Sequence, residues 1–259
     1  MIVGNLPDKI EHPLTIPDNA CEGHFPGRPL VPGVLQLQLV AEALGANIGA
    51  QVAVGGVPRV RFRKPIVPGD VCRLEAQRKG STWRFRIIAE RKIVTEGALE
   101  ISSLPHMDGS QHEPAAPEDI AQAKRRLPHR EPMLLAHRVL EIGDGWGVCA
   151  GAVSQSAPFA RGPLVPALAA VEVAAQSLGM IECSAESAEG PPKIGLLVAV
   201  SNARLSAASI PVGAELRAQV QRTAWMPPMA RAEALVTSAD REVAACTLTT
   251  WAPDFQSPE

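Results

Sequence analysis

The amino-acid sequence predicts an α+β protein made of two tandem copies of one module, each with a buried helix and an antiparallel sheet. The chain has 259 residues, which suits two small domains. When the sequence is shifted by 134 residues, residues 25–32 align with residues 159–166, and both segments contain Pro-Leu-Val-Pro. Leu44-Gly45 then falls on Leu178-Gly179 without a gap. An internal repeat of this length indicates a duplicated module.

Each copy is expected to contain one long helix that follows a proline. Residues 34–44 follow Pro32-Gly33, and residues 168–181 follow Pro166-Ala167. In both segments the apolar residues recur at helical spacing, and few polar residues interrupt them. A helix that is apolar nearly all round is stable only when other elements wrap it. We therefore expect a sheet around each helix.

The segments that follow each helix have the alternating pattern of half-buried strands. In the first copy these segments are residues 59–63, 71–77, 83–89 and 93–101. In the second copy they are residues 194–200, 215–221, 230–237 and 243–251. Turn sequences such as Pro68-Gly69-Asp70 and Lys79-Gly80-Ser81 stand between them, which indicates antiparallel pairing.

A linker is expected between the copies, at residues 104–123. Prolines, a glycine and acidic residues are concentrated there: Pro105, Asp108, Gly109, Glu113, Pro114, Pro117, Glu118 and Asp119. The chain therefore divides into an N-terminal module, residues 1–103, and a C-terminal module, residues 124–259. Residues 118–126 are expected to start a helix that Pro128 ends.

The composition excludes several classes of function. The net charge is −2 and only 3% of residues are aromatic, so nucleic-acid binding is not expected. The five cysteines are widely spaced and form no Cys-x-x-Cys pair, which argues against a disulfide framework and a structural zinc site. The most apolar stretch, residues 164–181, contains Pro166 and Glu172, so no membrane span is expected. We expect a cytoplasmic protein with reduced thiols and no metal.

Two motifs in the first half are specific enough to indicate a family. They are His24-Phe-Pro-Gly-Arg-Pro-Leu-Val-Pro-Gly33 and Arg61-Phe-Arg-Lys-Pro-Ile-Val-Pro-Gly-Asp70. With these motifs the first half resembles the hotdog-fold dehydratases that act on 3-hydroxyacyl groups carried by an acyl carrier protein.

The second half resembles the same superfamily. The motifs are Leu127-Pro-His-Arg-Glu-Pro-Met-Leu-Leu135 and Val171-Glu-Val-Ala-Ala-Gln176, and the sequence departs at His137, where the family usually has an acidic residue. The likeness covers residues 15–103 and 125–252, and it is closest to the partner-type dehydratases of aryl polyene biosynthesis. It implies a double hotdog, in which the two modules form a pseudo-dimer within one chain.

The resemblance also implies a catalytic pair, a histidine and an acidic residue fourteen positions later, contributed by different subunits of a dimer. Fourteen positions after His24 stands Gln38, which cannot ionise. In the second copy Pro158 matches His24, and Glu172 stands fourteen positions further on. Each copy has kept the opposite half of the pair. We therefore expect one composite site with His24 and Glu172, and an inactive site with Pro158 and Gln38.

The implied reaction is the removal of water from a 3-hydroxyacyl thioester. His24 would take the proton from C2, since a neutral imidazole with a pKa of about 6.5 suits a base. Glu172 would protonate the departing C3 hydroxyl, and its apolar neighbours should raise its pKa. Gln176, one turn further along, should orient the carboxyl. The expected substrate-binding residues are Gly33, whose N–H would meet the thioester oxygen, together with Gln176 and Leu30.

The resemblance implies that the substrate arrives on the phosphopantetheine of an acyl carrier protein and that no other cofactor takes part. Residues 59–92 contain eleven Lys and Arg against three acidic residues. The side chains of Arg59, Arg61 and Arg63 alternate along one strand and share a face. With Lys64 they form the expected landing patch for an acidic carrier protein. A solvated sheet face is the alternative interpretation.

Two other functions stay open at this point. A hotdog acyl thioesterase would use Glu172 to direct water and would not need His24. A non-catalytic acyl-binding partner of another dehydratase is the second alternative, because each module lacks half of the pair. A CoA hydratase of the Asp-x-Asn-x-x-His type is disfavoured, since Asp18, Asn19 and His24 lack that spacing. Acyl chain length, pathway and association beyond the pseudo-dimer are not readable.

Overall fold

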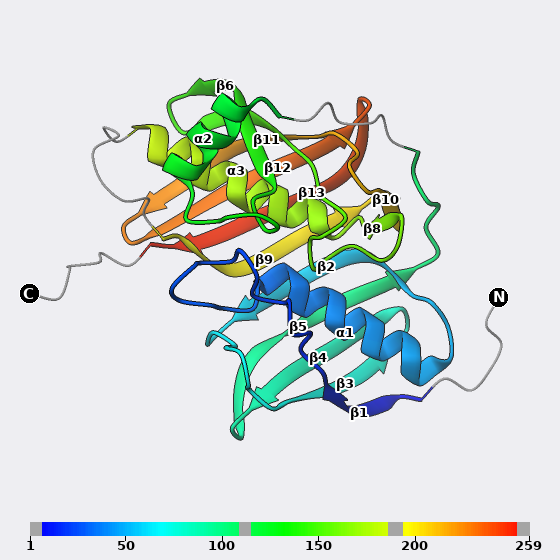
Figure 1. The fold of residues 1–259 in the computed structure, drawn as a ribbon. Helices are drawn as coiled ribbons and strands as arrows, with labels where there is room; N and C mark the ends of the chain where they lie inside the picture. The colour runs from blue at the N-terminus through cyan, green and yellow to red at the C-terminus, as the bar shows by residue number, and fades with distance from the viewer. Residues whose placement is uncertain (1–6, 109–114, 186–193, 253–259) are drawn as a thin grey trace, which may run out of the picture.

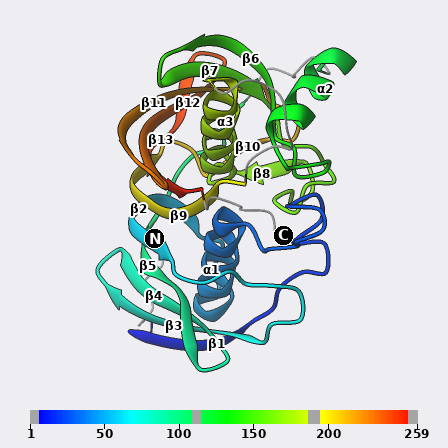
Figure 2. The same cartoon turned by 90° about the vertical axis from the view of Figure 1, so that its left-hand side faces the viewer.

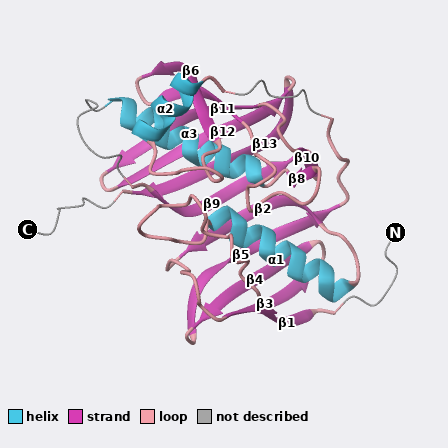
Figure 3. Ribbon diagram, viewed as in Figure 1, coloured by secondary structure: helices cyan, strands magenta, loops and turns pink. Residues whose placement is uncertain are grey.

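The computed structural model describes residues 7–108, 115–185 and 194–252, and one long curved sheet dominates it (Figure 1). The first module contains β1 (Lys9–Leu14), α1 (Gly33–Ile48), β2 (Ala53–Phe62), β3 (Cys72–Lys79), β4 (Thr82–Ala89) and β5 (Lys92–Ser102). The second contains α2 (Pro117–Arg126), β6 (Ala136–Gly143), β7 (Trp146–Gly151), β8 (Leu164–Pro166), α3 (Ala169–Ala185), β9 (Leu196–Leu205), β10 (Ser209–Pro211), β11 (Leu216–Met226), β12 (Met229–Ser238) and β13 (Arg241–Trp251). The helices lie on one face of the sheet (Figure 3).

The sheet runs from one module into the other without a break. Its eleven strands are ordered β1-β3-β4-β5-β2-β9-β13-β12-β11-β7-β6, and neighbouring strands are antiparallel. The junction is the pair β2 and β9, where Val60 lies opposite Val200 and Arg61 opposite Ala199. Viewed along the sheet, α1 and α3 lie next to each other, and each is wrapped by its own half (Figure 2). The predicted double hotdog is confirmed.

Helix α1 forms where the sequence predicts it, and both of its ends have a local cause. Pro32 precedes its first residue, and Gly49, with φ of 68°, ends it in the left-handed conformation that glycine adopts at low cost. Gly33 packs closely against Phe62, because a Cβ atom there would lie 2.9 Å from Cζ of that ring. The start of α1 is therefore pressed against the end of β2.

Helix α3 is buried through small side chains. Ala169, Ala170 and Ala174 have no exposed surface, so the strands of the second half approach the helix closely. The apolar segment at residues 164–181 thus forms β8 and most of α3 in the interior of the module. Within the described ranges, no helix has the length and apolar character needed to cross a membrane.

The sheet also contains strands that precede the helices, which the sequence pattern does not predict. β1 comes before α1, and the hairpin of β6 and β7 comes before α3. β1 is an edge strand and contains Pro13, which an edge tolerates because one side of the strand needs no ladder hydrogen bonds. β6 is the opposite edge, and its apolar residues Leu140 and Ile142 lie on exposed positions, so its apolar alternation is weak.

The segment expected to be a linker is attached to the second module at both of its described ends. The Met107 N–H donates to the Ser209 carbonyl at 2.9 Å, and the Ala208 N–H donates to the Pro105 carbonyl at 2.8 Å. Helix α2 contains the expected boundary at residue 124 and buries Ala123. Gly109, Glu113 and Pro114 lie outside the described residues.

Candidate active site

His24 is held in a turn-rich loop between β1 and α1. The flanking residues Gly23 and Phe25 have φ angles of 72° and 54°, so the chain turns sharply on both sides of the imidazole. A Cβ atom at Gly23 would lie 2.1 Å from the Arg130 carbonyl oxygen, and the Arg130 N–H donates to the Gly23 carbonyl at 2.8 Å. Glycine therefore lets this loop of the first module touch the segment before β6 of the second.

One hydrogen bond determines which nitrogen of His24 carries the proton. Nδ1 lies 2.6 Å from the carbonyl oxygen of Leu30. A carbonyl oxygen only accepts hydrogen bonds, so Nδ1 is the donor and the neutral ring keeps its lone pair on Nε2. The ring is 8% exposed. Leu30 thus orients the imidazole through its backbone, and Nε2 is free to act as a base.

Glu172 lies in the first turn of α3 and is 5% exposed. Its Oε1 accepts a hydrogen bond of 3.2 Å from Nε2 of Gln176, one turn further along the helix. The Gln176 amide is itself fixed by three backbone groups. It donates to the Met133 carbonyl at 2.8 Å and accepts from the N–H groups of Leu135 and Ala136 at 2.8 and 3.2 Å. The carboxyl is therefore oriented by an amide that has no freedom to turn.

A cavity of about 240 Å³ brings the two modules together at these residues. His24, Leu30 and Gly33 line it from the first module, and Glu172 and Gln176 line it from the second. Gly33 is the first residue of α1, so its N–H has no acceptor within the helix. All five predicted catalytic and substrate-binding residues therefore lie around one cavity.

Burial shifts the two ionisable groups in opposite directions. It lowers the pKa of His24 to about 4, although the hydrogen bond to the Leu30 carbonyl favours the protonated ring. It raises the pKa of Glu172 to about 7, although the hydrogen bond from Gln176 favours the carboxylate. Near neutral pH the imidazole is therefore neutral, with its proton on Nδ1, and a large share of the Glu172 carboxyl still holds its proton.

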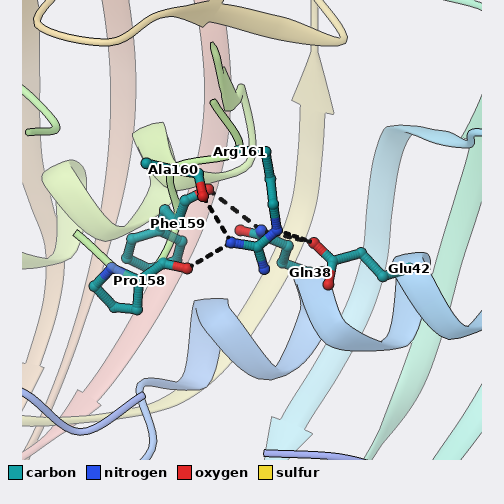
Figure 4. A network of polar contacts seen from close by, with 6 residues as sticks. All are labelled: Gln38, Glu42, Pro158, Phe159, Ala160 and Arg161. Atoms are coloured by element: carbon teal, nitrogen blue, oxygen red, sulfur yellow. Dashed lines mark hydrogen bonds and ion pairs between the residues drawn. The ribbon is translucent and has the colours of Figure 1, made fainter. Parts of the chain in front are cut away.

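The second site has lost this chemistry and contains a network of polar contacts instead (Figure 4). The Arg161 guanidinium donates to Glu42 Oε1 and to the carbonyls of Pro158 and Ala160, each at 2.8 Å. Gln38 Nε2 donates to the same Glu42 oxygen at 2.9 Å. The cavity beside it is larger, about 720 Å³. Neither Pro158 nor Gln38 has a side chain that titrates. The larger cavity is therefore not the candidate active site, and the smaller one, which contains His24 and Glu172, is.

The four residues of the predicted carrier patch divide into two pairs. Arg63 and Lys64 line the smaller cavity, whereas Arg59 and Arg61 lie on exposed positions of β2 and do not reach it. Arg63 is held by Glu96 of β5, with Nε donating to Oε1 at 2.9 Å. This places two of the four cationic groups beside the residues of the site.

His129 is a residue of the site that the sequence alone does not single out. It lies between α2 and β6, is 6% exposed and lines the same cavity. One side-chain ligand atom each of His24, His129 and Glu172 lie within 4.8 Å of one another, and two imidazoles and a carboxylate are also metal-ligating types. The feature of the sequence that points to His129 is its position inside the Leu127–Leu135 motif.

Both halves of the chain match models of dehydratase families. Residues 121–258 match the ApeP-like family, described as ApeP dehydratase, and residues 7–98 match the ApeI-like family, described as ApeI dehydratase. The 3-hydroxyacyl-acyl-carrier-protein dehydratase FabZ of Rhizorhabdus wittichii is 40% identical over 84 residues, which is 28% of this chain and 54% of that protein. FabZ of Legionella pneumophila strain Corby is 40% identical over 85 residues, 28% of this chain and 57% of that protein. The chain thus spans little more than half the length of these curated relatives.

Solved structures share the fold over nearly the whole chain. The dehydratase domain of RzxB from Pseudomonas fluorescens has a TM-score of 0.67 at 12% identity, with 93% of each chain covered. The dehydratase domain of PpsC from Mycobacterium tuberculosis has a TM-score of 0.63 at 14% identity, with 95% of this chain and 93% of that one covered. Together with the composite cavity, the family matches identify the chain: it belongs to the ApeP-like dehydratase family, and residues 7–98 of the same polypeptide are similar to the ApeI-like dehydratase family.

Proposed function

We propose that the chain is a dehydratase, which removes water from 3-hydroxyacyl thioesters on an acyl carrier protein and yields trans-2-enoyl thioesters. The observation that carries this proposal is the meeting of His24 and Glu172 in one cavity, each from a different module and each shifted toward the protonation state it needs. Fatty-acid or polyketide-type biosynthesis, including that of aryl polyenes, is the setting in which such a reaction belongs.

The reaction needs two proton transfers and no external oxidant or reductant. Nε2 of His24 takes a proton from C2, and the electrons of that C–H bond form the C2–C3 double bond. The C3–O bond breaks as Glu172 gives its proton to the hydroxyl, which leaves as water. The Gly33 N–H, at the positive end of α1, stabilises the negative charge that develops on the thioester oxygen. Gln176 holds the carboxyl in place.

Incubation with 3-hydroxyacyl carrier proteins of graded chain length tests the proposal. Intact-protein mass spectrometry should show the acyl group losing one water. Release of the free carrier thiol would instead indicate the thioesterase alternative. An acyl group that stays unchanged at every chain length would exclude both enzymatic functions and leave the non-catalytic acyl-binding partner.

The carrier protein and its phosphopantetheine are proposed as the partner and the only prosthetic group involved. No metal or organic cofactor is needed, because both protons move between side chains and substrate. A cytoplasmic location and the division into modules at residues 1–103 and 124–259 belong to the same proposal. Arg63 and Lys64 at the cavity, with Arg59 and Arg61 further out on β2, would receive the acidic carrier.

Neutralising the carrier patch should weaken recognition of the carrier more than the chemistry. We expect Arg61→Gln/Arg63→Gln/Lys64→Gln to raise KM for a carrier-bound substrate by about tenfold at low salt, since exposed charges mainly steer encounter. A short pantetheine thioester should be affected less than about twofold. Glutamine is preferable to glutamate at residue 63, because a carboxylate there would face Glu96.

Steady-state kinetics over a series of salt concentrations measure this effect. High salt should reduce the difference between the variant and the unmodified chain, because salt screens exposed charges. Arg231→Gln, an exposed arginine on β12 of the other module, is the control and should behave like the unmodified chain. Equal losses on both substrates would show that the three residues serve the site or the fold and not the carrier.

The pH dependence of kcat/KM should follow the two shifted groups. The active form has a neutral His24 and a protonated Glu172, so activity should be highest between pH values of about 4 and about 7. Above about 7 it should fall about tenfold per pH unit as Glu172 loses its proton, and below about 4 it should fall as His24 gains one. Initial rates on a pantetheine thioester, with thermal melts at each pH, measure the profile. A rate that stays constant up to pH of about 9 would contradict Glu172 as the acid.

A further inference from the structure

His129 is a buried imidazole at the cavity, and the proposed reaction gives it no task. Its ring centroid lies 5.2 Å from that of His24 and 5.0 Å from that of Phe25. One of its ring nitrogens lies within 4.8 Å of a ligand atom of His24 and of Glu172. The imidazole therefore stands beside both members of the proposed catalytic pair.

Among the residues that the structure describes, the ring is held by packing against the rings of His24 and Phe25. Nδ1 of His129 is buried and has no hydrogen-bond partner among the described residues. The backbone carbonyl of His129, and not its ring, accepts a hydrogen bond from the Arg130 guanidinium at 2.6 Å. A buried polar atom without a partner costs free energy, so a histidine kept in this state points to a partner that arrives with a ligand.

The surroundings keep His129 neutral. Burial lowers its pKa well below the ordinary value, and the nearby His24 and Arg130 act in the same direction. The neutral ring has one N–H donor and one acceptor nitrogen. A hydroxyl group also donates one hydrogen bond and accepts others, so it is the ligand group that such a ring can bind in either tautomer.

The position of His129 selects one hydroxyl. In the proposed reaction, the thioester oxygen lies at the Gly33 N–H on the first module, and the leaving hydroxyl lies at Glu172 on the second. His129 also belongs to the second module and lines the cavity beside Glu172. The group within reach of both side chains is the C3 hydroxyl.

We propose that His129 binds the C3 hydroxyl of the substrate, next to Glu172, and thereby makes the cavity select 3-hydroxyacyl groups over acyl groups that lack this hydroxyl. The inference rests on the proposed function, because it uses the substrate pose of the dehydratase reaction. His129 moves no proton in this scheme. It holds the oxygen where Glu172 protonates it.

Binding without turnover tests the selection directly. In a His24→Ala chain, which lacks the base, calorimetry should give a lower Kd for 3-hydroxyacyl pantetheine than for its 3-deoxy counterpart, by about tenfold. In His24→Ala/His129→Ala the two Kd values should agree within about twofold, with the 3-deoxy value unchanged. If both ligands weaken by the same factor, His129 only shapes the cavity, and the proposal is overturned. If the preference for the hydroxylated ligand persists, another group binds the hydroxyl, and the proposal fails as well.

Kinetics with His24 in place supply the second measurement. His129→Ala should lower kcat/KM about 10- to 100-fold, and His129→Asn, whose amide both donates and accepts, should recover part of the loss. His12→Ala, on β1 and away from the cavity, is the matched histidine control and should keep the activity of the unmodified chain. A His129→Ala chain with unchanged kcat/KM would overturn the inference. Absence of dehydration by the unmodified chain would instead refute the proposed function, while the two Kd values would still decide the role of His129.

Discussion

The variants His24→Ala and Glu172→Gln should each lower kcat/KM about 1,000-fold, because each change removes one of the two proton transfers. Gln38→Ala should stay within about threefold of the unmodified chain, since Gln38 does not ionise and lines the other cavity. Rates on one 3-hydroxyacyl pantetheine, corrected for folded fraction, measure all three variants. A Gln38→Ala chain as impaired as Glu172→Gln would contradict the assignment of a single working site.

The Glu172→Gln variant should remain folded, so its loss of activity can be assigned to the missing proton donor and not to unfolding. The raised pKa of Glu172 means that the folded chain binds this proton more tightly than the unfolded chain does. The stabilisation from the carboxyl is therefore full below a pH of about 4.5 and is lost as the pH rises through about 7. At pH of about 8 the glutamine variant should melt no lower than the unmodified chain, because it avoids a buried charge and its amide oxygen can still accept from Gln176.

Cutting the chain in the linker should abolish activity, and joining the halves should restore it. Fragments 1–108 and 116–259 would each hold one member of the catalytic pair. Each alone would also expose the strand edge that β2 and β9 share, where Val60 and Val200 are fully buried in the intact chain. We expect less than about 1% of the intact activity from either fragment, since loss of one partner costs at least about 100-fold.

Co-expression of the two fragments should yield a complex with most of the intact activity. The covalent link only raises the effective concentration of one half for the other, so a tight complex can replace it. Co-purification through a tag on one fragment and turnover of a pantetheine thioester measure the result. A fragment that dehydrates substrate alone at a rate near that of the intact chain would show that His24 and Glu172 do not share a site.

The repeat was the feature that made the architecture predictable from the sequence. It aligned Gln38 with Glu172, and it placed α1 and α3 at equivalent positions. β1 and the hairpin of β6 and β7 were not predicted, because they lie outside the repeated block and β1 and β6 are edge strands of the sheet. β1 is only six residues long and contains Pro13, so its alternating Ile10 and Leu14 give a short signal.

The site was predictable only in part. His24, Glu172 and Gln176 follow from motif and spacing, and they lie around one cavity. His129 does not follow, because its place beside His24 depends on the contact of Gly23 with Arg130, which joins two modules through the backbone. The separation of Arg63 from Arg59 and Arg61 also needed the fold, since the end of β2 decides which of them reaches the cavity.

A double-mutant cycle on His24 and Glu172 tests most directly whether the two modules form one composite site. The measurement is kcat/KM of the unmodified chain, His24→Ala, Glu172→Gln and His24→Ala/Glu172→Gln on the same pantetheine thioester. If both residues serve one reaction, the double variant should lie within about threefold of the more impaired single variant, because a site that has lost one partner gains little from the other. Single variants that each keep about half of the activity, with only the double variant falling to background, would show two independent sites and contradict the composite site.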